Sequence, residues 1–235
     1  MANAVLTNQG VWLLDSDPYA SAKIDWHLAR SGKPKVVNER GLRDAQRALR
    51  IAHGNAVFEE TPLPADMPHL QLAMPETGAP PDYFAMGGWE FCSRRFREAL
   101  DQPEDVVQFT PVDLISGNAR ARAQDYRWMR VLAWQRVMDL QRSEYEPADG
   151  CDPVTGETRP EAIWVLRYAL LENLHPPVGV FRVDQTPGAV MVTDAVAERM
   201  LRAGCTGLRF RDPTVRVFRE RTRYRTLTGV AEVED

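Results

Sequence analysis

The residues that could carry out acid–base or metal chemistry are few in this sequence. The four histidines are His27, His53, His69 and His175. His175 follows Glu172 by three residues, a spacing that places a carboxylate and an imidazole on one face of a helix. Such a pair could act in acid–base catalysis or bind a metal. A solvated helix end before two prolines is the more common arrangement, and it is the interpretation we favour.

Nucleophilic and phosphate-binding chemistry has no local motif either. The sequence lacks a phosphate-binding loop, a nucleophile elbow, a dinucleotide-binding fingerprint and an H-E-x-x-H metal motif. Its three cysteines, Cys92, Cys151 and Cys205, are more than fifty residues apart, which indicates packing residues or free thiols. We therefore expect no cofactor, no metal and no catalysis. The alternative is an enzyme with a dispersed site around His175, Glu172 or Cys205.

Arginine dominates the basic residues, since only Lys23, Lys33 and Lys35 are lysines. Residues 209–225 contain seven arginines and two carboxylates, so this segment has a net charge of +5 and the rest of the chain −9. One interpretation is an arm that binds the phosphates of a nucleic acid. The other is an exposed or edge strand whose arginines discourage edge-to-edge pairing or pair with carboxylates elsewhere. The second is favoured, so nucleic acid is an unlikely partner.

The overall composition is that of a globular protein. The 235 residues are 44% hydrophobic and 26% charged, with a formal net charge of −4. No stretch approaches the roughly 18 apolar residues of a transmembrane helix, and the first residues lack the basic and apolar regions of a signal peptide. These features predict a soluble, cytoplasmic protein with no membrane partner.

Hydrophobic periodicity predicts both helices and strands, which must position any functional side chain. A helix is expected over residues 41–50, and Ser93 is expected to cap a second helix that carries Phe96. Residues 125–140 fit either period, although their aromatic residues favour a strand, and residues 146–160 are predicted to form a polar loop. Further strands are expected at residues 5–15, 69–74, 83–86, 89–92, 106–112 and 178–183. The predicted fold class is α+β, with a mixed or antiparallel sheet and a few packing helices.

Two segments repeat the same order of strand, capped helix and strand. Ser93 and Phe109 are 16 residues apart, and the corresponding Thr193 and Phe210 are 17 residues apart. This spacing suggests two related strand–helix–strand units on one core. A domain boundary would fall in the proline-rich stretch near residue 80, which would separate an N-terminal α/β region (1–80) from a second domain (81–235). One continuous domain is the alternative.

Several short motifs occur in a recognisable order. They are DLQRSEY (139–145), VFR (180–182), VTD (192–194) and AGCTGLRF (203–210), with FTPV (109–112) upstream. Together, over residues 83–215, they resemble a bacterial immunity-protein family of polymorphic and contact-dependent toxin systems, formerly classed as a domain of unknown function. The G-x-T-G-L-x-F segment is the most distinctive part.

The resemblance implies a non-enzymatic antitoxin that binds and neutralises a cognate secreted toxin, with type VI secretion as an expected route of delivery. The motif residues also have physical roles that need no toxin. Gly204 is expected to stop a helix in the left-handed conformation, Gly207 to allow a tight entry to a strand, and Phe210 to fill the core. Ser143 is expected to cap or turn, and Asp139 or Glu144 to pair with an arginine such as Arg182.

The candidate partner-binding residues are aromatic side chains and nearby carboxylates. Aromatic anchors contribute most to binding when they fill a pocket of the partner. A net-acidic protein would also be steered towards a basic toxin that acts on nucleic acid. Self-association into a homo-oligomer stays open. The candidates are Trp26, Tyr83, Trp89, Tyr145, Asp149 and Asp152.

Overall fold

The chain forms two compact units, each assembled from separate segments. The structure is a computed structural model that describes residues 8–16, 35–36, 39–53, 62–64, 70–74, 80–86, 89–151, 158–216 and 222–233. Unit 1 consists of Met1–Asp15, Ala133–Leu201 and Arg209–Asp235, and unit 2 of Ser16–Leu132 and Arg202–Leu208. The boundary expected at residue 80 adjoins residues outside the described ranges and stays a prediction.

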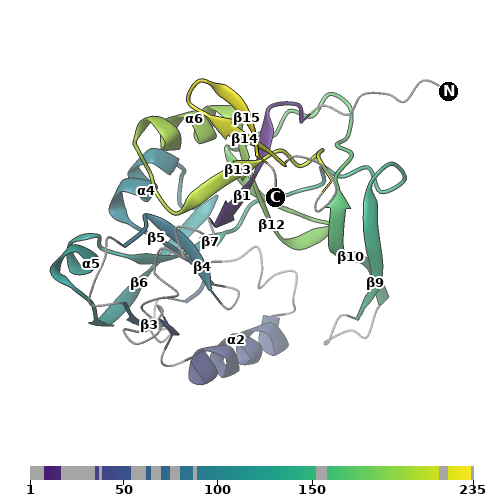
Figure 1. Cartoon of the computed structure of the whole chain (residues 1–235). Coiled ribbons are helices and arrows are strands. Elements are labelled where there is room, and N and C mark those ends of the chain that lie inside the picture. Colours follow the sequence, from purple (N-terminus) through teal and green to yellow (C-terminus); the bar gives the residue numbers. More distant parts are fainter. Residues whose placement is uncertain are drawn as a thin grey trace. The chain divides into compact units, whose positions relative to one another are not determined.

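Unit 2 contains a six-stranded sheet with the order β2-β3-β6-β7-β5-β4 (Figure 1). Most neighbours are antiparallel, but β3 and β6 are parallel, so the sheet is mixed. Its strands are β2 (Lys35–Val36), β3 (Leu70–Ala73), β4 (Tyr83–Met86), β5 (Trp89–Cys92), β6 (Val107–Ser116) and β7 (Arg127–Val131). Its helices are α2 (Glu39–His53), α4 (Arg94–Leu100) and α5 (Ala119–Ala123).

Local sequence signals account for the helices of unit 2. Ser93 caps α4 as predicted, because its Oγ accepts the backbone N–H of Phe96 at 3.2 Å. The Phe96 ring stacks on Tyr83 of β4, with the ring centroids 5.1 Å apart. Helix α2 packs Ala45 and Leu49 against the buried cluster of the sheet. An amphipathic pattern therefore determined which face of each helix is buried.

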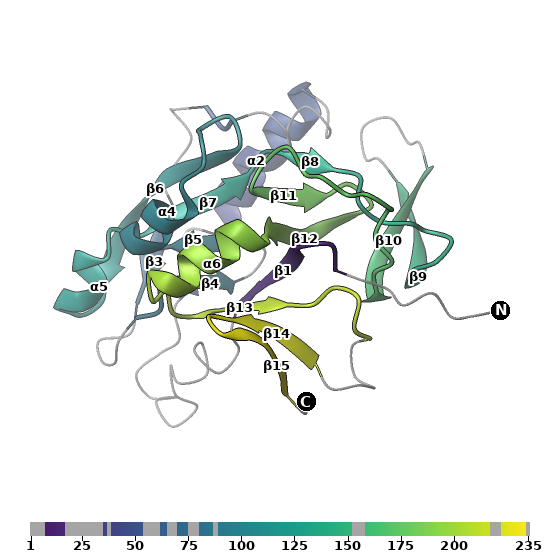
Figure 2. The same cartoon turned by 90° about the horizontal axis from the view of Figure 1, so that it is seen from above.

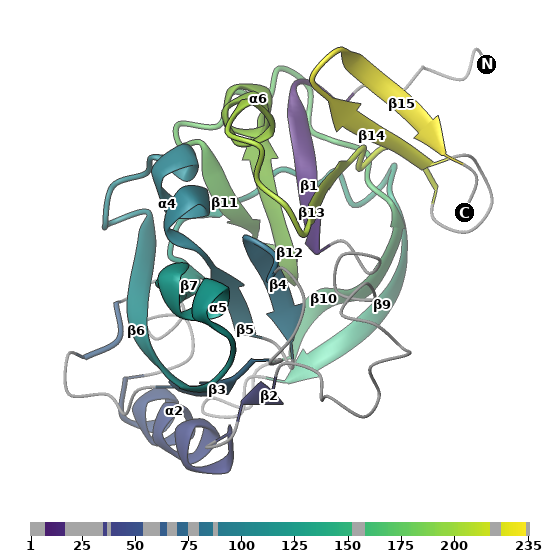
Figure 3. The same ribbon diagram turned by 60° about the vertical axis from the view of Figure 1, so that its left-hand side comes forward.

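Unit 1 contains a seven-stranded sheet with the order β15-β14-β13-β1-β12-β11-β8 (Figure 2). A separate two-stranded antiparallel ribbon consists of β9 (Glu144–Cys151) and β10 (Thr158–Arg167). The strands of the sheet are β1 (Val11–Ser16), β8 (Trp134–Gln135), β11 (Val180–Val183), β12 (Thr186–Thr193), β13 (Leu208–Arg211), β14 (Thr222–Thr226) and β15 (Gly229–Val233). Helix α6 (Asp194–Arg202) follows β12, and Figure 3 shows β14 and β15 as a hairpin next to β13.

The same strand order recurs in both units. In unit 2 the hairpin β4–β5 leads through α4 to β6, and β7 lies between β5 and β6 in the sheet. In unit 1 the hairpin β11–β12 leads through α6 to β13, and β1 lies between β12 and β13. The predicted α+β class, with mixed sheets and two related strand–helix–strand units, is confirmed. Each unit has a further strand inserted in its middle.

Two local predictions are wrong. Residues 146–160, predicted to be a polar loop, largely belong to the ribbon β9–β10. A two-stranded ribbon tolerates Pro147 and Pro160 because every second backbone N–H points to its open edge and needs no partner strand. The segment with Glu172 and His175 forms a turn and not a helix, and Asn173 there has a positive φ of 57°.

Candidate partner interface

A hydrogen-bonded turn leads into β9 and determines where the ribbon begins. The Ser143 Oγ donates to the carbonyl oxygen of Asp139 at 2.6 Å and accepts the backbone N–H of Ala169 at 2.9 Å. The Asp139 carboxylate accepts the backbone N–H of Gln141 at 3.0 Å. Ser143 therefore links the turn before β9 to the chain that follows β10, and it has the turn role that its sequence position suggested.

The Glu144 carboxylate holds the base of the ribbon by charge. Its Oε1 is 2.6 Å from Arg167 Nη2 on the partner strand, and its Oε2 is 2.7 Å from Arg216 Nε beyond β13. From the sequence we expected Glu144 to pair with an arginine such as Arg182. The structure supplies Arg167 and Arg216. One carboxylate thus joins both ribbon strands to the carboxyl-terminal part of unit 1.

Apolar contacts anchor the same end of the ribbon. Tyr145 and Val165 are cross-strand partners, and both pack against the buried cluster of unit 1. Strand β10 also contacts β12 of the seven-stranded sheet. The cluster consists of Val11, Leu13, Val137, Met138, Tyr168, Leu170, Phe181, Val183 and Met191.

In unit 2 the most distinctive motif is held by a buried carboxylate. Asp82 is 1% exposed, and it accepts hydrogen bonds from Ser93 Oγ at 2.6 Å and from the backbone N–H and Oγ1 of Thr206, both at 3.0 Å. Arg95 Nη1 lies 3.5 Å from its Oδ2. A buried carboxylate is tolerated only when such partners satisfy it. Through the bonds to Thr206, Asp82 holds residues 204–207 against the start of β4, and we call this arrangement the Asp82 clasp. The motif therefore has a structural role.

The two motif glycines both have positive φ, 67° at Gly204 and 83° at Gly207. Gly204 follows α6 and has the left-handed conformation expected of a helix stop. Gly207 lies so close to Tyr83 that a Cβ there would be 2.3 Å from its carbonyl oxygen. Phe210, the last residue of the motif, is 1% exposed.

The candidate partner-binding residues are divided between the two units. Tyr83 and Trp89 are 1% and 4% exposed and belong to the core of unit 2. Tyr145 is half-buried at the base of the ribbon in unit 1, and Asp149 lies farther along the same strand. The use of this set as an interface stays a prediction. Two of its members, Trp26 and Asp152, lie outside the described residues.

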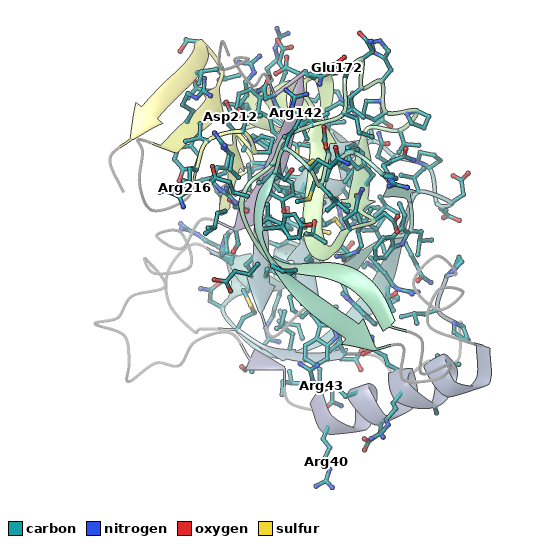
Figure 4. The ribbon with its side chains drawn as sticks, turned by 90° about the vertical axis from the view of Figure 1, so that its right-hand side faces the viewer. Arg40, Arg43, Arg142, Glu172, Asp212 and Arg216 are labelled. Carbon is teal, nitrogen blue, oxygen red and sulfur yellow. The ribbon has the colours of Figure 1, made fainter. Side chains whose placement is uncertain are left out.

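The residues proposed for a dispersed enzyme site, His175, Glu172 and Cys205, do not include an activated nucleophile. Burial raises the pKa of the Cys205 thiol to about 12 and raises that of Cys92 still further, so both are protonated at neutral pH. Glu172 is 84% exposed and pairs with Arg142 at 3.6 Å (Figure 4), and His175 is exposed. In the described part of the chain, no group of three or more His, Cys, Asp or Glu residues could hold a metal ion.

Most arginines of residues 209–225 have a partner within unit 1. Five of the seven arginines in this segment have a carboxylate or an aromatic ring as partner. Arg219 and Arg221 lie outside the described residues. This pairing favours the interpretation as a charged strand over the phosphate-binding arm. Besides Arg216 with Glu144, the contacts are Arg211 Nε with Asp15 Oδ2 at 2.6 Å, Arg223 Nη2 with Asp212 Oδ2 at 3.0 Å, Arg225 Nε with Asp194 Oδ1 at 2.7 Å, and the Arg209 guanidinium 5.3 Å from the Tyr224 ring.

Sequence reasoning missed two features that hold these segments. Asp82 follows Pro80 and Pro81 in an unpatterned stretch, and no local signal marks it as buried. The ribbon was missed because carboxylates, glycine and proline dominate residues 146–160. A weak signal was available in Tyr145 and Val165, apolar residues that flank the polar segment on both sides.

A comparison with known protein families matches one family over most of the chain. The model of the immunity protein family Imm11 matches residues 18–215. The match includes the turn and ribbon, the Asp82 clasp and all the ordered motifs of the sequence. A search of curated proteins found no match. Within the described residues, no helix is both long and apolar enough to cross a membrane.

Proposed function

The chain belongs to the Imm11 immunity protein family, and from this premise we propose that it binds and neutralises one cognate secreted bacterial toxin without catalysis. It would protect the producing cell and its siblings by forming a stoichiometric complex. The family match over most of the chain is the observation that carries this proposal.

The chemistry of the described residues supports binding over catalysis. The thiols of Cys92 and Cys205 are held protonated by burial. The distinctive motif is engaged in the clasp between Asp82 and Thr206, where its polar groups already satisfy one another. Most arginines of residues 209–225 are likewise engaged in pairs. These groups therefore stabilise the fold and leave the toxin to be recognised by surface features.

The proposal places the complex in the cytoplasm. A toxin delivered by contact or by type VI secretion would be met there after entry. Cys92 and Cys205 are free thiols, which agrees with a reducing compartment.

The test is a titration of toxin activity with the purified chain. The toxin would be the toxic C-terminal domain encoded immediately upstream of the gene for this chain. We expect activity to fall linearly and to vanish at one equivalent of the chain, because an inhibitor that binds tightly acts by occupancy. Co-expression should also rescue cells from that toxin and not from an unrelated one.

Two results would overturn the proposal. Failure to bind or to rescue against any neighbouring toxin domain would remove the cognate partner. Complete inactivation at a small fraction of an equivalent would indicate turnover, and the enzyme alternative would then be correct.

A further inference from the structure

Among the described side chains, the contacts that anchor the ribbon β9–β10, called the arm below, lie at the end that carries Glu144 and Tyr145. Its anchors are the Glu144 ion pairs and the packing of Tyr145 and Val165. Beyond them the pairing runs from Glu146 and Trp164 to Cys151 and Thr158, with one register shift between Ala162 and Trp164. At about 3.3 Å per residue, this distal part extends for about 17–20 Å. Figure 1 shows it leading away from the seven-stranded sheet.

Along both edges of the distal ribbon, the backbone hydrogen-bonding groups have no partner strand among the described residues. Among the strands that the structure describes, none pairs with either strand of the ribbon from outside. An isolated two-stranded ribbon is only marginally stable in water, and proteins protect such edges with proline and charge. Pro147 and Pro160 within the strands provide this protection. These prolines therefore oppose aggregation through the edges of the ribbon.

The charge of this arm indicates what partner it fits. The distal strands contain three carboxylates, Glu146, Asp149 and Glu161, against the single basic residue Arg159. In contrast, at the base of the ribbon the acidic Glu144 is offset by two arginines. The distal strands therefore carry a net negative charge, whereas the base of the ribbon does not.

We infer that this ribbon is the arm that docks on the toxin, and that its partner is a positively charged protein surface of the kind that binds nucleic acid. A protein that binds phosphates must carry clustered Lys and Arg. Carboxylates on the ribbon would attract such a surface and accelerate association. This inference rests on the proposed function and adds to it the docking segment and the charge of the partner.

The test neutralises the arm without changing its length. The arm variant combines Glu146→Gln, Asp149→Asn and Glu161→Gln, in the full chain. The matched control combines Glu98→Gln, Glu104→Gln and Asp105→Asn, three exposed carboxylates of unit 2, and changes the net charge equally. The probe is a catalytically inactive form of the toxic domain encoded upstream. Association and dissociation rates are measured over a series of salt concentrations.

We expect the arm variant to associate at least about tenfold more slowly than the wild type at low salt, and to lose most of the salt dependence. The control should retain both. Hydrogen exchange on the wild-type complex provides a readout that needs no substitution: amides of residues 144–151 and 158–167 should become protected when the toxin binds.

Four outcomes would overturn the inference. If the wild type binds the toxin while the ribbon amides stay unprotected, another surface docks, and the proposed function survives. Equal association rates and salt dependence for the arm and control variants would remove the role of charge. Protection that rises with the concentration of the chain alone would make a second copy the occupant. If the wild type binds no toxin, the proposed function fails first and the docking arm fails with it.

Discussion

Replacing Gly207 by alanine should destabilise the chain much more than the same substitution at Gly204. Both glycines have positive φ, 83° and 67°, so an alanine at either position incurs a backbone cost of about 1–2 kcal/mol. The positions differ in the space around them. A Cβ at Gly207 would lie 2.3 Å from the Tyr83 carbonyl oxygen and 2.4 Å from the Pro81 Cβ, whereas at Gly204 it would meet nothing within 4 Å.

The extra cost at Gly207 arises because its neighbours cannot rotate away. One is the backbone of β4 and the other is a proline ring, so the strand must shift, and overpacking of this kind costs about 1–3 kcal/mol. A shift of Tyr83 would also strain the hydrogen bonds between Asp82 and Thr206. We therefore expect a loss of about 2–5 kcal/mol for Gly207→Ala and about 1–2 kcal/mol for Gly204→Ala.

The assay is equilibrium unfolding in urea, followed by tryptophan fluorescence. Trp89 and Trp128 are buried in unit 2 and Trp12 is buried in unit 1, so the fluorescence follows the unfolding of both units. Far-UV circular dichroism on the same samples would reveal whether the two units unfold in separate transitions. Equal midpoints and equal slopes for the two variants would refute the reasoning, because the close approach at Gly207 would then have no energetic consequence.

Three further predictions concern unit 1. Leu13→Ala, at a 3% exposed position of the buried cluster, should lower the free energy of unfolding by about 2–5 kcal/mol, whereas Leu227→Ala, 56% exposed, should change it by less than about 0.5 kcal/mol in the same urea assay. The hydrogen bond from Arg225 holds the pKa of Asp194 below its usual value. The ionised carboxylate therefore stabilises the fold at pH values above the unfolded pKa of about 3.9. This stabilisation is lost as the pH falls through the lower pKa of the folded state. Asp194→Asn should therefore flatten the dependence of Tm on pH below about pH 4. At about pH 7 it should lower the free energy of unfolding by less than about 1 kcal/mol, because the carboxylate is 44% exposed. A variant whose Tm still falls below about pH 4 as steeply as that of the wild type would contradict this. Glu144→Gln should accelerate hydrogen exchange in β9 and β10 and lower the free energy of global unfolding by only about 1 kcal/mol. Unchanged exchange in these strands would show that the ion pairs do not hold the ribbon.

Local patterns predicted much of the fold. The cap at Ser93, the helix that begins near residue 40 and the strands around residue 90 follow from side-chain periodicity and hydrogen-bonding preferences that act within a few residues. The ribbon could not be predicted in this way. Its distal strands lack apolar alternation, and their hydrogen bonds depend on a partner strand that the local sequence does not specify.

The candidate interface was predicted less well than the fold. Tyr145 and Asp149 were selected by residue type and lie on the ribbon, whereas Tyr83 and Trp89 satisfied the same criterion and are buried in unit 2. Aromatic residues serve in cores and interfaces alike. The exposed fraction of the side chain distinguishes a core aromatic residue from an interface one. This exposure depends on how segments that are distant in the sequence pack.

By itself the sequence determined the α+β class, most element positions, the repeated strand–helix–strand order and the family motifs, because each is encoded by neighbouring residues. Only the tertiary structure decided which distant segments meet. It placed β1 between β12 and β13, and paired Asp15 with Arg211, 196 residues away. Such contacts arise when the whole chain buries its apolar faces and satisfies its charges together. No local window contains that information.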